Sequence, residues 1–306
     1  MNIDLWKSRF KQYLELRNFS PRSIEGYLSE VKAFLGWLDA VGVASLAALT
    51  RDHVEDYRAF LAETTYRGRR LAVSTQAHRL GTLKTFTRFL AHERFIPFDP
   101  SAGVDLPRVP QTLPRTVLSE LEAERVVECA TGVGPVEIRN RAMLEVLYCT
   151  GIRNQELREL KLGDVQLERA ELIVARGKGS KPRALPLGED AIAWLKEYLL
   201  RARPYLVCAA AQRVLFLSYR GNALTRAAVA KIVRGQACRS GLKKPVTPHV
   251  LRRSCATHML RHGAGLRQVQ ELLGHASPQT TERYTRLEIT DLRRALQRCH
   301  PRERKE

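Results

Sequence analysis

Residues 247–284 read TPHVLRRSCATHMLRHGAGLRQVQELLGHASPQTTERY, and the rest of the chain is best understood from this stretch. Thr247 is a suitable N-cap and Pro248 a suitable first residue for a helix. On that helix His249 and Arg252 are three residues apart, so both side chains project from one face. The opening of the stretch therefore presents an imidazole and a guanidinium to the same place.

The second half of the stretch adds a second histidine and a tyrosine. A glycine-containing break at 262–265 precedes a predicted helix over 266–273, which Gly274 closes. His275 follows this glycine at once, and Tyr284 comes nine residues later. The stretch thus holds two histidines, an arginine and a tyrosine at fixed spacings.

The charge of the chain points to a class of partner. The 306 residues allow two domains with separate cores, and 44% hydrophobic with 27% charged residues is ordinary for a soluble globular protein. The net charge of +19, most of it carried after residue 100, favours a polyanion, usually nucleic acid. The alternative is a merely basic soluble protein.

The sequence predicts no metal site and no membrane segment. The six cysteines are scattered without a C-x-x-C spacing, so neither a zinc site nor a disulfide framework is indicated. The first ten residues lack an apolar h-region, and no apolar run is long enough to span a bilayer. We expect a cytoplasmic protein.

Residues 1–100 are predicted to form four helices and no strand, from apolar residues spaced at three and four. Between the third and fourth helices lies a basic loop with one aromatic residue, Tyr66-Arg67-Gly68-Arg69-Arg70. Contact with the DNA phosphate backbone is a natural use for Arg67, Arg69 and Arg70. A solvated surface loop is the alternative.

A proline-rich stretch then separates two domains. Five prolines lie between Pro97 and Pro114, a density that rules out a continuous helix and stiffens the chain. We therefore predict a linker over 101–116 and a second domain over 117–306. That domain opens with Ser119-Glu120-Leu121-Glu122, a capping box ahead of a helix.

The second domain is predicted to be helical apart from a small β-hairpin. A helix over 137–149 stops at Thr150-Gly151-Ile152, and Arg153 emerges just past the break. Strands at 172–176 and 182–187 flank a basic tip at 177–181. Further helices are expected at 189–203, 226–240 and 291–299, with a short possible strand at 214–217. The fold class is mainly α with a small antiparallel sheet.

Four segments in this domain resemble, in order, the motifs of the tyrosine recombinases, the phage integrase family that includes the Xer-like proteins. Residues 150–157 are similar to T-G-x-R-x-x-E-L, residues 177–179 to its G-K-G turn, and residues 249–252 to H-x-L-R. Leu273-Gly274-His275 followed by Tyr284 is similar to L-G-H and the nucleophile. The resemblance implies a two-domain DNA clamp, with a helical SAM-like core-binding domain and a mixed α/β catalytic domain.

The chemistry of a phosphodiester explains why such residues are needed. Its transition state gathers negative charge on the non-bridging oxygens, which fixed cations stabilise. Arg153 and Arg252 suit this, because a guanidinium is always charged and its fork matches paired phosphate oxygens. Tyr284 is the expected nucleophile. Its hydroxyl, with a pKa of ~10, needs a base or a cationic surrounding.

The resemblance assigns the remaining roles. It implies that His249 takes the tyrosine proton, that His275 donates a hydrogen bond to the phosphate, and that Glu156 supports the arginine. Lys178 matches the family's general acid for the departing 5′-oxygen. Lys181, three residues further on, is the competing candidate and a further DNA contact.

The implied reaction forms a 3′-phosphotyrosine link and frees a 5′-hydroxyl, with no cofactor and no metal. The implied partner is double-stranded DNA carrying a specific recombination site, bound by a homo- or hetero-tetramer on two sites. Residues 291–299 are either the C-terminal segment that packs into a neighbouring protomer in this family or a capping helix. Gln155 and Arg253 depart from the usual pattern, which bears on the subgroup and not on the chemistry.

Two other functions remain open at this point. One is a nicking-closing enzyme similar to type IB topoisomerases, and the other is a DNA-binding regulator that keeps the fold without catalysis. Within recombination, the role is either integration and excision of mobile DNA or resolution of chromosome dimers.

Overall fold

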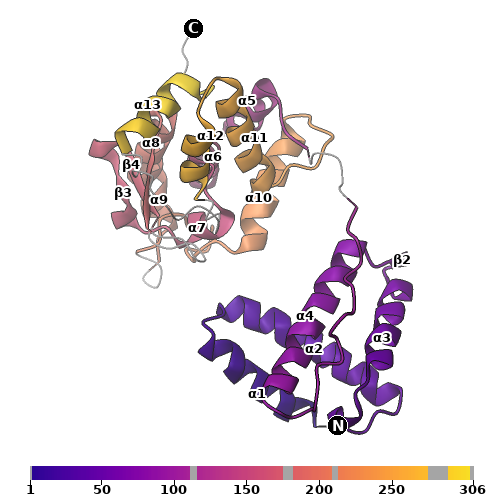
Figure 1. Ribbon diagram of the computed structural model, residues 1–306. Helices are drawn as coiled ribbons and strands as arrows, with labels where there is room; N and C mark the ends of the chain where they lie inside the picture. Colours follow the sequence, from indigo (N-terminus) through magenta and orange to yellow (C-terminus); the bar gives the residue numbers. More distant parts are fainter. Residues whose placement is uncertain (1, 111–115, 175–181, 209–212, 275–288, 304–306) are drawn as a thin grey trace. The chain divides into compact units, whose positions relative to one another are not determined.

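The computed structural model describes residues 2–110, 116–174, 182–208, 213–274 and 289–303, with the backbone alone at 289–292. The chain divides into two compact units, Met1–Leu113 and Pro114–Glu306 (Figure 1). Within these described ranges, no helix is both long and apolar enough to cross a lipid bilayer.

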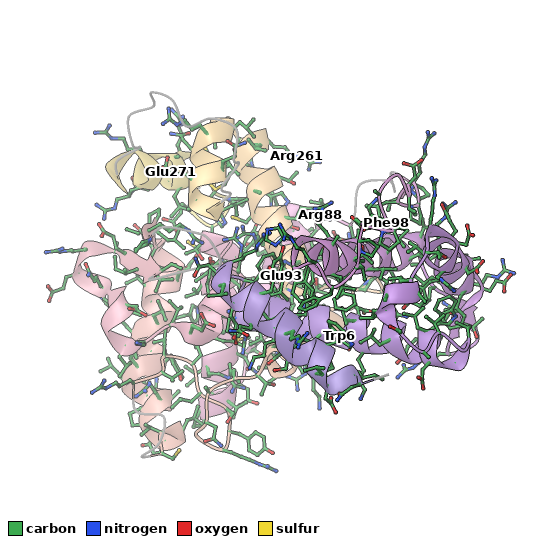
Figure 2. The ribbon with its side chains drawn as sticks, turned by 60° about the horizontal axis from the view of Figure 1, so that its bottom comes forward. Trp6, Arg88, Glu93, Phe98, Arg261 and Glu271 are labelled. Carbon is green, nitrogen blue, oxygen red and sulfur yellow. The ribbon has the colours of Figure 1, made fainter. Side chains whose placement is uncertain are left out.

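The N-terminal unit is built by four α-helices, as the periodicity predicts: α1 (Ile3–Leu16), α2 (Pro21–Ala40), α3 (Arg51–Glu63) and α4 (Val73–His92), with a 3₁₀ turn, η1 (Leu46–Ala48). Their apolar stripes meet in one core in which Phe10, Phe34 and Phe86 are fully buried. Trp6 packs edge-on against Phe95, which holds the chain leaving α4 against α1. Figure 2 labels Trp6 and Glu93, the residue that follows α4.

The prediction of no strand in this unit is wrong at one place. The basic loop forms a minimal hairpin in which β1 (Thr65–Tyr66) pairs antiparallel with β2 (Arg69–Arg70). Arg67 and Gly68 both have positive φ, 52° and 74°, the combination that a two-residue hairpin turn requires. Two-residue strands carry no alternating pattern, so the sequence gives no strand signal here.

The C-terminal unit surrounds one helix that is buried almost all round. This is α6 (Pro135–Thr150), whose residues from Ile138 to Thr150 are all buried. The other helical elements of this unit are α5 (Glu120–Glu128), α7 (Asn154–Glu159), η2 (Leu162–Asp164), η3 (Leu167–Arg169), α8 (Glu189–Glu197), a π-helical turn η4 (Tyr198–Ala202), α9 (Arg203–Leu206), α10 (Arg226–Arg239), α11 (Pro248–Arg261), α12 (Leu266–Leu273) and α13 (Ile289–Cys299).

A three-stranded antiparallel sheet lies beside these helices. The predicted hairpin strands are β4 (Glu171–Val174) and β5 (Arg183–Pro186), paired with Val174 opposite Arg183. A third strand, β3 (Val165–Gln166), pairs with the outer edge of β4 and was not predicted. The tip at 177–181 lies outside the described residues. At 214–217 there is no full strand, only single bridges from Val214 and Leu217.

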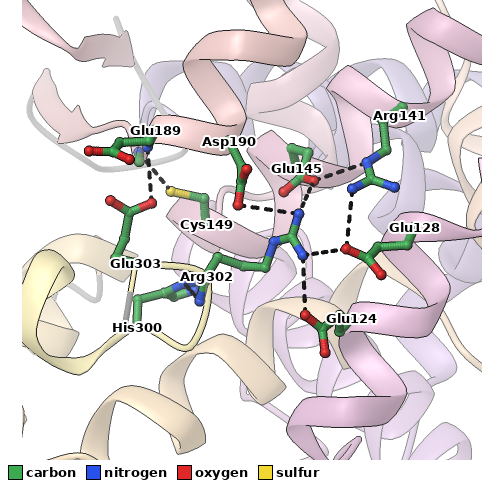
Figure 3. Close-up of polar contacts among 11 residues, drawn as sticks. Glu124, Glu128, Arg141, Glu145, Cys149, Glu189, Asp190, His300, Arg302 and Glu303 are labelled. Atoms are coloured by element: carbon green, nitrogen blue, oxygen red, sulfur yellow. Dashed lines mark hydrogen bonds and ion pairs between the residues drawn. The ribbon is translucent and has the colours of Figure 1, made fainter. Parts of the chain in front are cut away.

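The end of the chain folds back onto the same unit. Helix α13 contacts β5, α11 and α12, and after it His300 hydrogen-bonds the Tyr148 carbonyl of the central helix. Arg302 lies among carboxylates from α5, α6 and α8 (Figure 3). Its guanidinium is 2.7 Å from Glu145, 2.8 Å from Glu128, 3.4 Å from Glu124 and 3.3 Å from Asp190.

Arg302→Gln should therefore lower the free energy of unfolding by about 2–4 kcal/mol, because the buried Glu145 carboxylate loses one of its two cations. Denaturant unfolding at pH 7 measures this. Arg201→Gln is the control: it breaks a more exposed pair between η4 and Glu197, the last residue of α8, for which about 0.5 kcal/mol is expected. Equal losses from the two variants would contradict a buried network at Arg302.

Candidate active site

The first catalytic candidate is positioned by the end of α6. The helix stops because Gly151 adopts the left-handed conformation, with φ 59°. A Cβ at Gly151 would lie 2.8 Å from a Leu273 methyl carbon, so the close approach of α12 also requires glycine here. Arg153 then becomes the N-cap of α7. The break at Gly151 thus places Arg153, which is half-buried, between α6 and α7.

Glu156, one turn into α7, holds Arg153 in place. Its carboxylate accepts hydrogen bonds from the Arg153 backbone N–H at 3.0 Å and from Nη1 of the same residue at 2.9 Å. It also accepts two from Arg183 on β5, Nη1 at 3.0 Å and Nη2 at 2.8 Å. Burial by itself raises the pKa of Glu156, but the bonds from Arg183 and Arg153 outweigh it and bring the pKa to about 2. The group is a carboxylate throughout the neutral range.

The second candidate arginine comes from α11, where Thr247 is the N-cap and Pro248 the first residue, as predicted. Arg252 is buried, and its guanidinium donates to the Gly151 carbonyl at 2.6 Å and the Leu273 carbonyl at 2.7 Å. Burial, with the neighbouring Arg153 as the next cause, lowers the pKa of Arg252 to about 10. It remains a cation at neutral pH.

A groove of about 610 Å³ opens beside Arg252. His249, exposed and one turn earlier on α11, lines it together with Arg252, Arg253 and Leu273. The groove therefore has both charged and apolar lining residues, and His249 and Arg252 both belong to its lining.

Three arginines meet at the C-terminal end of α12. The carbonyl of Leu272 accepts from Arg183 Nε at 3.4 Å, that of Leu273 from Arg252, and that of Gly274 from Arg153 Nη2 at 2.7 Å. The last carbonyls of a helix lack intrahelical donors and carry partial negative charge, so they suit cations. Consecutive backbone oxygens thus gather side chains from three separate parts of the unit.

The structure brings together Arg153, Glu156 and Arg252, with His249 on the adjoining groove. Lys178, Lys181, His275 and Tyr284 lie outside the described residues, so their roles stay predictions; His275 directly follows Gly274. The three arginines of the predicted DNA-contact loop, Arg67, Arg69 and Arg70, are exposed on the β1–β2 hairpin of the N-terminal unit.

Sequence reasoning missed Arg183. The signal available was a charged residue at the start of a short apolar strand, Arg183-Ala184-Leu185-Pro186, whose later residues are buried. Such a residue needs a partner, but its partner, Glu156, is 27 residues away in the chain.

Comparison with known proteins now identifies the family. The pattern of the phage integrase family matches residues 116–290, and that of the phage integrase N-terminal SAM-like domain matches residues 8–94. The chain belongs to the phage integrase family. It is a tyrosine-type site-specific DNA recombinase, because curated relatives of this kind match it over nearly its whole length.

Two such relatives are the tyrosine recombinase XerC 2 of Ralstonia nicotianae, 39% identical over 94% of this chain and 83% of the relative, and the tyrosine recombinase XerD of Yersinia pestis, 37% identical over 94% and 93%. Among solved structures, a post-cleavage complex of the XerH recombinase with a palindromic difH substrate is 26% identical, with a TM-score of 0.65 over 85% of this chain and 75% of that one. A lambda integrase dimer bound to a core site shares the fold, with 22% identity and a TM-score of 0.67 over 94% and 100%.

Glu156→Gln removes the carboxylate that Arg153 and Arg183 share in this member of the phage integrase family. The resulting loss of unfolding free energy should depend on pH. Because the pKa of Glu156 is about 2 in the folded protein against a usual 4.5, the carboxylate contributes up to ~3 kcal/mol above pH 4.5. That contribution is lost as the pH falls toward 2. The difference in unfolding free energy between wild type and Glu156→Gln should be largest at pH 7 and shrink below pH 4.5.

Denaturant unfolding of both proteins between pH 7 and pH 3 measures this difference. Glu159→Gln, at the exposed end of the same helix, is the control and should show little difference at any pH. A Glu156→Gln effect that does not vary with pH would show that its carboxylate is not held by the arginines.

Proposed function

We propose that Tyr284 attacks a phosphodiester of the recombination site while Arg153 and Arg252 hold its non-bridging oxygens. The observation that supports this best is the meeting of the two guanidinium groups at the carbonyls of Leu273 and Gly274. In the sequence, His275 directly follows Gly274. A phosphate bound between the arginines would thus lie next to the segment that carries the tyrosine.

The proton movements assign the other residues. As the bond between the Tyr284 oxygen and phosphorus forms, the phenol proton passes to His249. As the bond between phosphorus and the deoxyribose 5′-oxygen breaks, Lys178 gives that oxygen a proton. His275 donates a hydrogen bond to the phosphate, and Glu156 orients Arg153. The product is a 3′-phosphotyrosine link, which a 5′-hydroxyl from a second duplex reopens without an added energy source.

We further propose that the protein works as a homo- or hetero-tetramer on two specific duplex sites in the cytoplasm. The net charge of +19 favours a polyanion, and fold neighbours include a lambda integrase tetramer bound to a Holliday junction. In the N-terminal unit, the hairpin of Arg67, Arg69 and Arg70 contacts DNA phosphates. The domain roles are core binding for 1–100 and catalysis for 117–306.

The nucleophile is tested by a covalent trap. Purified protein is mixed in EDTA buffer with end-labelled, randomly nicked genomic fragments from its source, and DNA that stays bound in SDS is counted and sequenced. Wild type should give adducts at one discrete site, while Tyr284→Phe should bind DNA equally and give none, because the phenol oxygen is the atom that bonds to phosphorus. Adducts formed by Tyr284→Phe would refute the assignment, and wild-type adducts at every sequence would refute a specific site.

The general acid is tested by comparing Lys178 with Lys181. Lys178→Ala should slow adduct formation by about 100-fold or more, because the 5′-oxygen departs without a proton. Lys181→Ala should slow it by less than about tenfold and weaken DNA binding, as for a phosphate contact. A DNA substrate with a 5′-thio leaving group, which needs no proton, should restore the rate of Lys178→Ala. The reverse order of effects would move the role to Lys181.

A further inference from the structure

Arg183 is the arginine at the end of α12 that the proposed chemistry does not use. Its three donor nitrogens all have partners inside the protein: both Nη atoms bond the two oxygens of Glu156, and Nε bonds the Leu272 carbonyl. Its side chain is 11% exposed, against 32% for Arg153. These contacts turn its fork toward the protein, where it shares Glu156 with Arg153.

We propose that Arg183 is a positioning residue that acts through Glu156 to hold Arg153 in the geometry that grips the scissile phosphate. The inference rests on the proposed role of Arg153 as a phosphate ligand. Arg183 locks the carboxylate by a two-point contact, and the carboxylate in turn fixes Arg153 at both its backbone N–H and Nη1. Arg153 then has a single orientation before DNA arrives.

The two-point contact explains why an arginine is needed here. A guanidinium offers two parallel N–H groups to the two oxygens of one carboxylate, while a lysine offers a single point charge. The fit is also close: a Cβ at Gly274 would lie 2.8 Å from Arg183 Cζ. Arg183 thereby joins β5 to the end of α12, the same backbone that receives Arg153 and Arg252.

The charges around Glu156 favour a positioning role for Arg183 over a purely structural ion pair with Glu156. A buried carboxylate needs compensation, and one arginine would provide it. Two arginines on one Glu156 leave an excess of positive charge. Arg252 adds to it, because it interacts electrostatically with Arg153, Glu156 and Arg183. The surplus is a standing attraction for a phosphate, and Arg183 keeps Glu156 from neutralising Arg153 alone.

Single-turnover rates of adduct formation on the nicked genomic fragments test the proposal, with DNA affinity measured on the same pool. Arg183→Gln should slow adduct formation by about 10- to 100-fold, the loss that a misplaced catalytic group causes, and change affinity by less than about twofold. Arg183→Lys should recover part of the rate. The matched control, Arg203→Gln, removes another buried arginine whose bonds go to the Val214 and Leu215 carbonyls; it should lower stability and leave the rate of the folded protein unchanged.

A double-mutant cycle separates the two ways in which Arg183 could act. If it acts through Glu156, Arg183→Gln combined with Glu156→Gln should be no slower than Glu156→Gln alone. Additive losses together with weaker DNA binding would show that Arg183 contacts DNA itself, and a wild-type rate in Arg183→Gln would show that it has no part in the reaction. Either result overturns the proposal.

A readout without DNA keeps the proposal distinct from the proposed function. Carboxyl ¹³C NMR follows the titration of Glu156: its pKa, about 2 in the wild type, should rise in Arg183→Gln. An unchanged titration would overturn the link between Arg183 and Glu156. A failure of the proposed function would give other results. Arg153→Ala would form adducts as fast as the wild type, or the wild type would form none.

Discussion

The carboxylate of Glu156, 2% exposed, is shared by two guanidinium groups from distant parts of the chain. Taking such a group out of water is unfavourable unless hydrogen bonds and cations replace the lost hydration. Arg153 and Arg183 supply both, and the low pKa of the group follows from them. This interaction joins α7 to β5, because the carboxylate on α7 accepts two hydrogen bonds from Arg183 on β5.

The C-terminal end of α12 holds the same two arginines, together with Arg252. Consecutive carbonyls of Leu272, Leu273 and Gly274 each take one arginine donor. Like-charged guanidinium groups would otherwise repel one another, and the partial negative charge at a helix C-terminus offsets that repulsion. The cluster is thus assembled before any phosphate binds, so that little reorganisation is needed during reaction.

The same physics serves stability elsewhere in the unit. Arg302 places its guanidinium among Glu145, Glu128, Glu124 and Asp190 and so attaches the end of the chain to α5, α6 and α8 (Figure 3). There the acidic groups outnumber the arginine, and the segment gains an anchor with no positive charge left over. At Glu156 the ratio is reversed. The balance of charges distinguishes a cluster suited to an anion from one that only holds helices together.

Much of this protein was determined by the sequence itself. The bounds of α11 and α12 follow from Thr247, Pro248 and Gly274, because caps and breaks are local chemistry. Arg153 and Arg252 were singled out by a helix break, by a neighbouring histidine and by their positions in the motifs, and the structure brings the two together at the end of α12. The short strands β1, β2 and β3 escaped prediction, since two residues show no period.

What only the tertiary structure decided is how the arginines are held. Backbone carbonyls look the same at every residue, so nothing in the sequence marks Leu272, Leu273 and Gly274 as the place where they meet. Arg183 pairs with a carboxylate on another element, and that pairing exists only once β5 packs beside α7. Residue types determine which chemistry is available, and the fold determines which charged side chains lie close enough to act together.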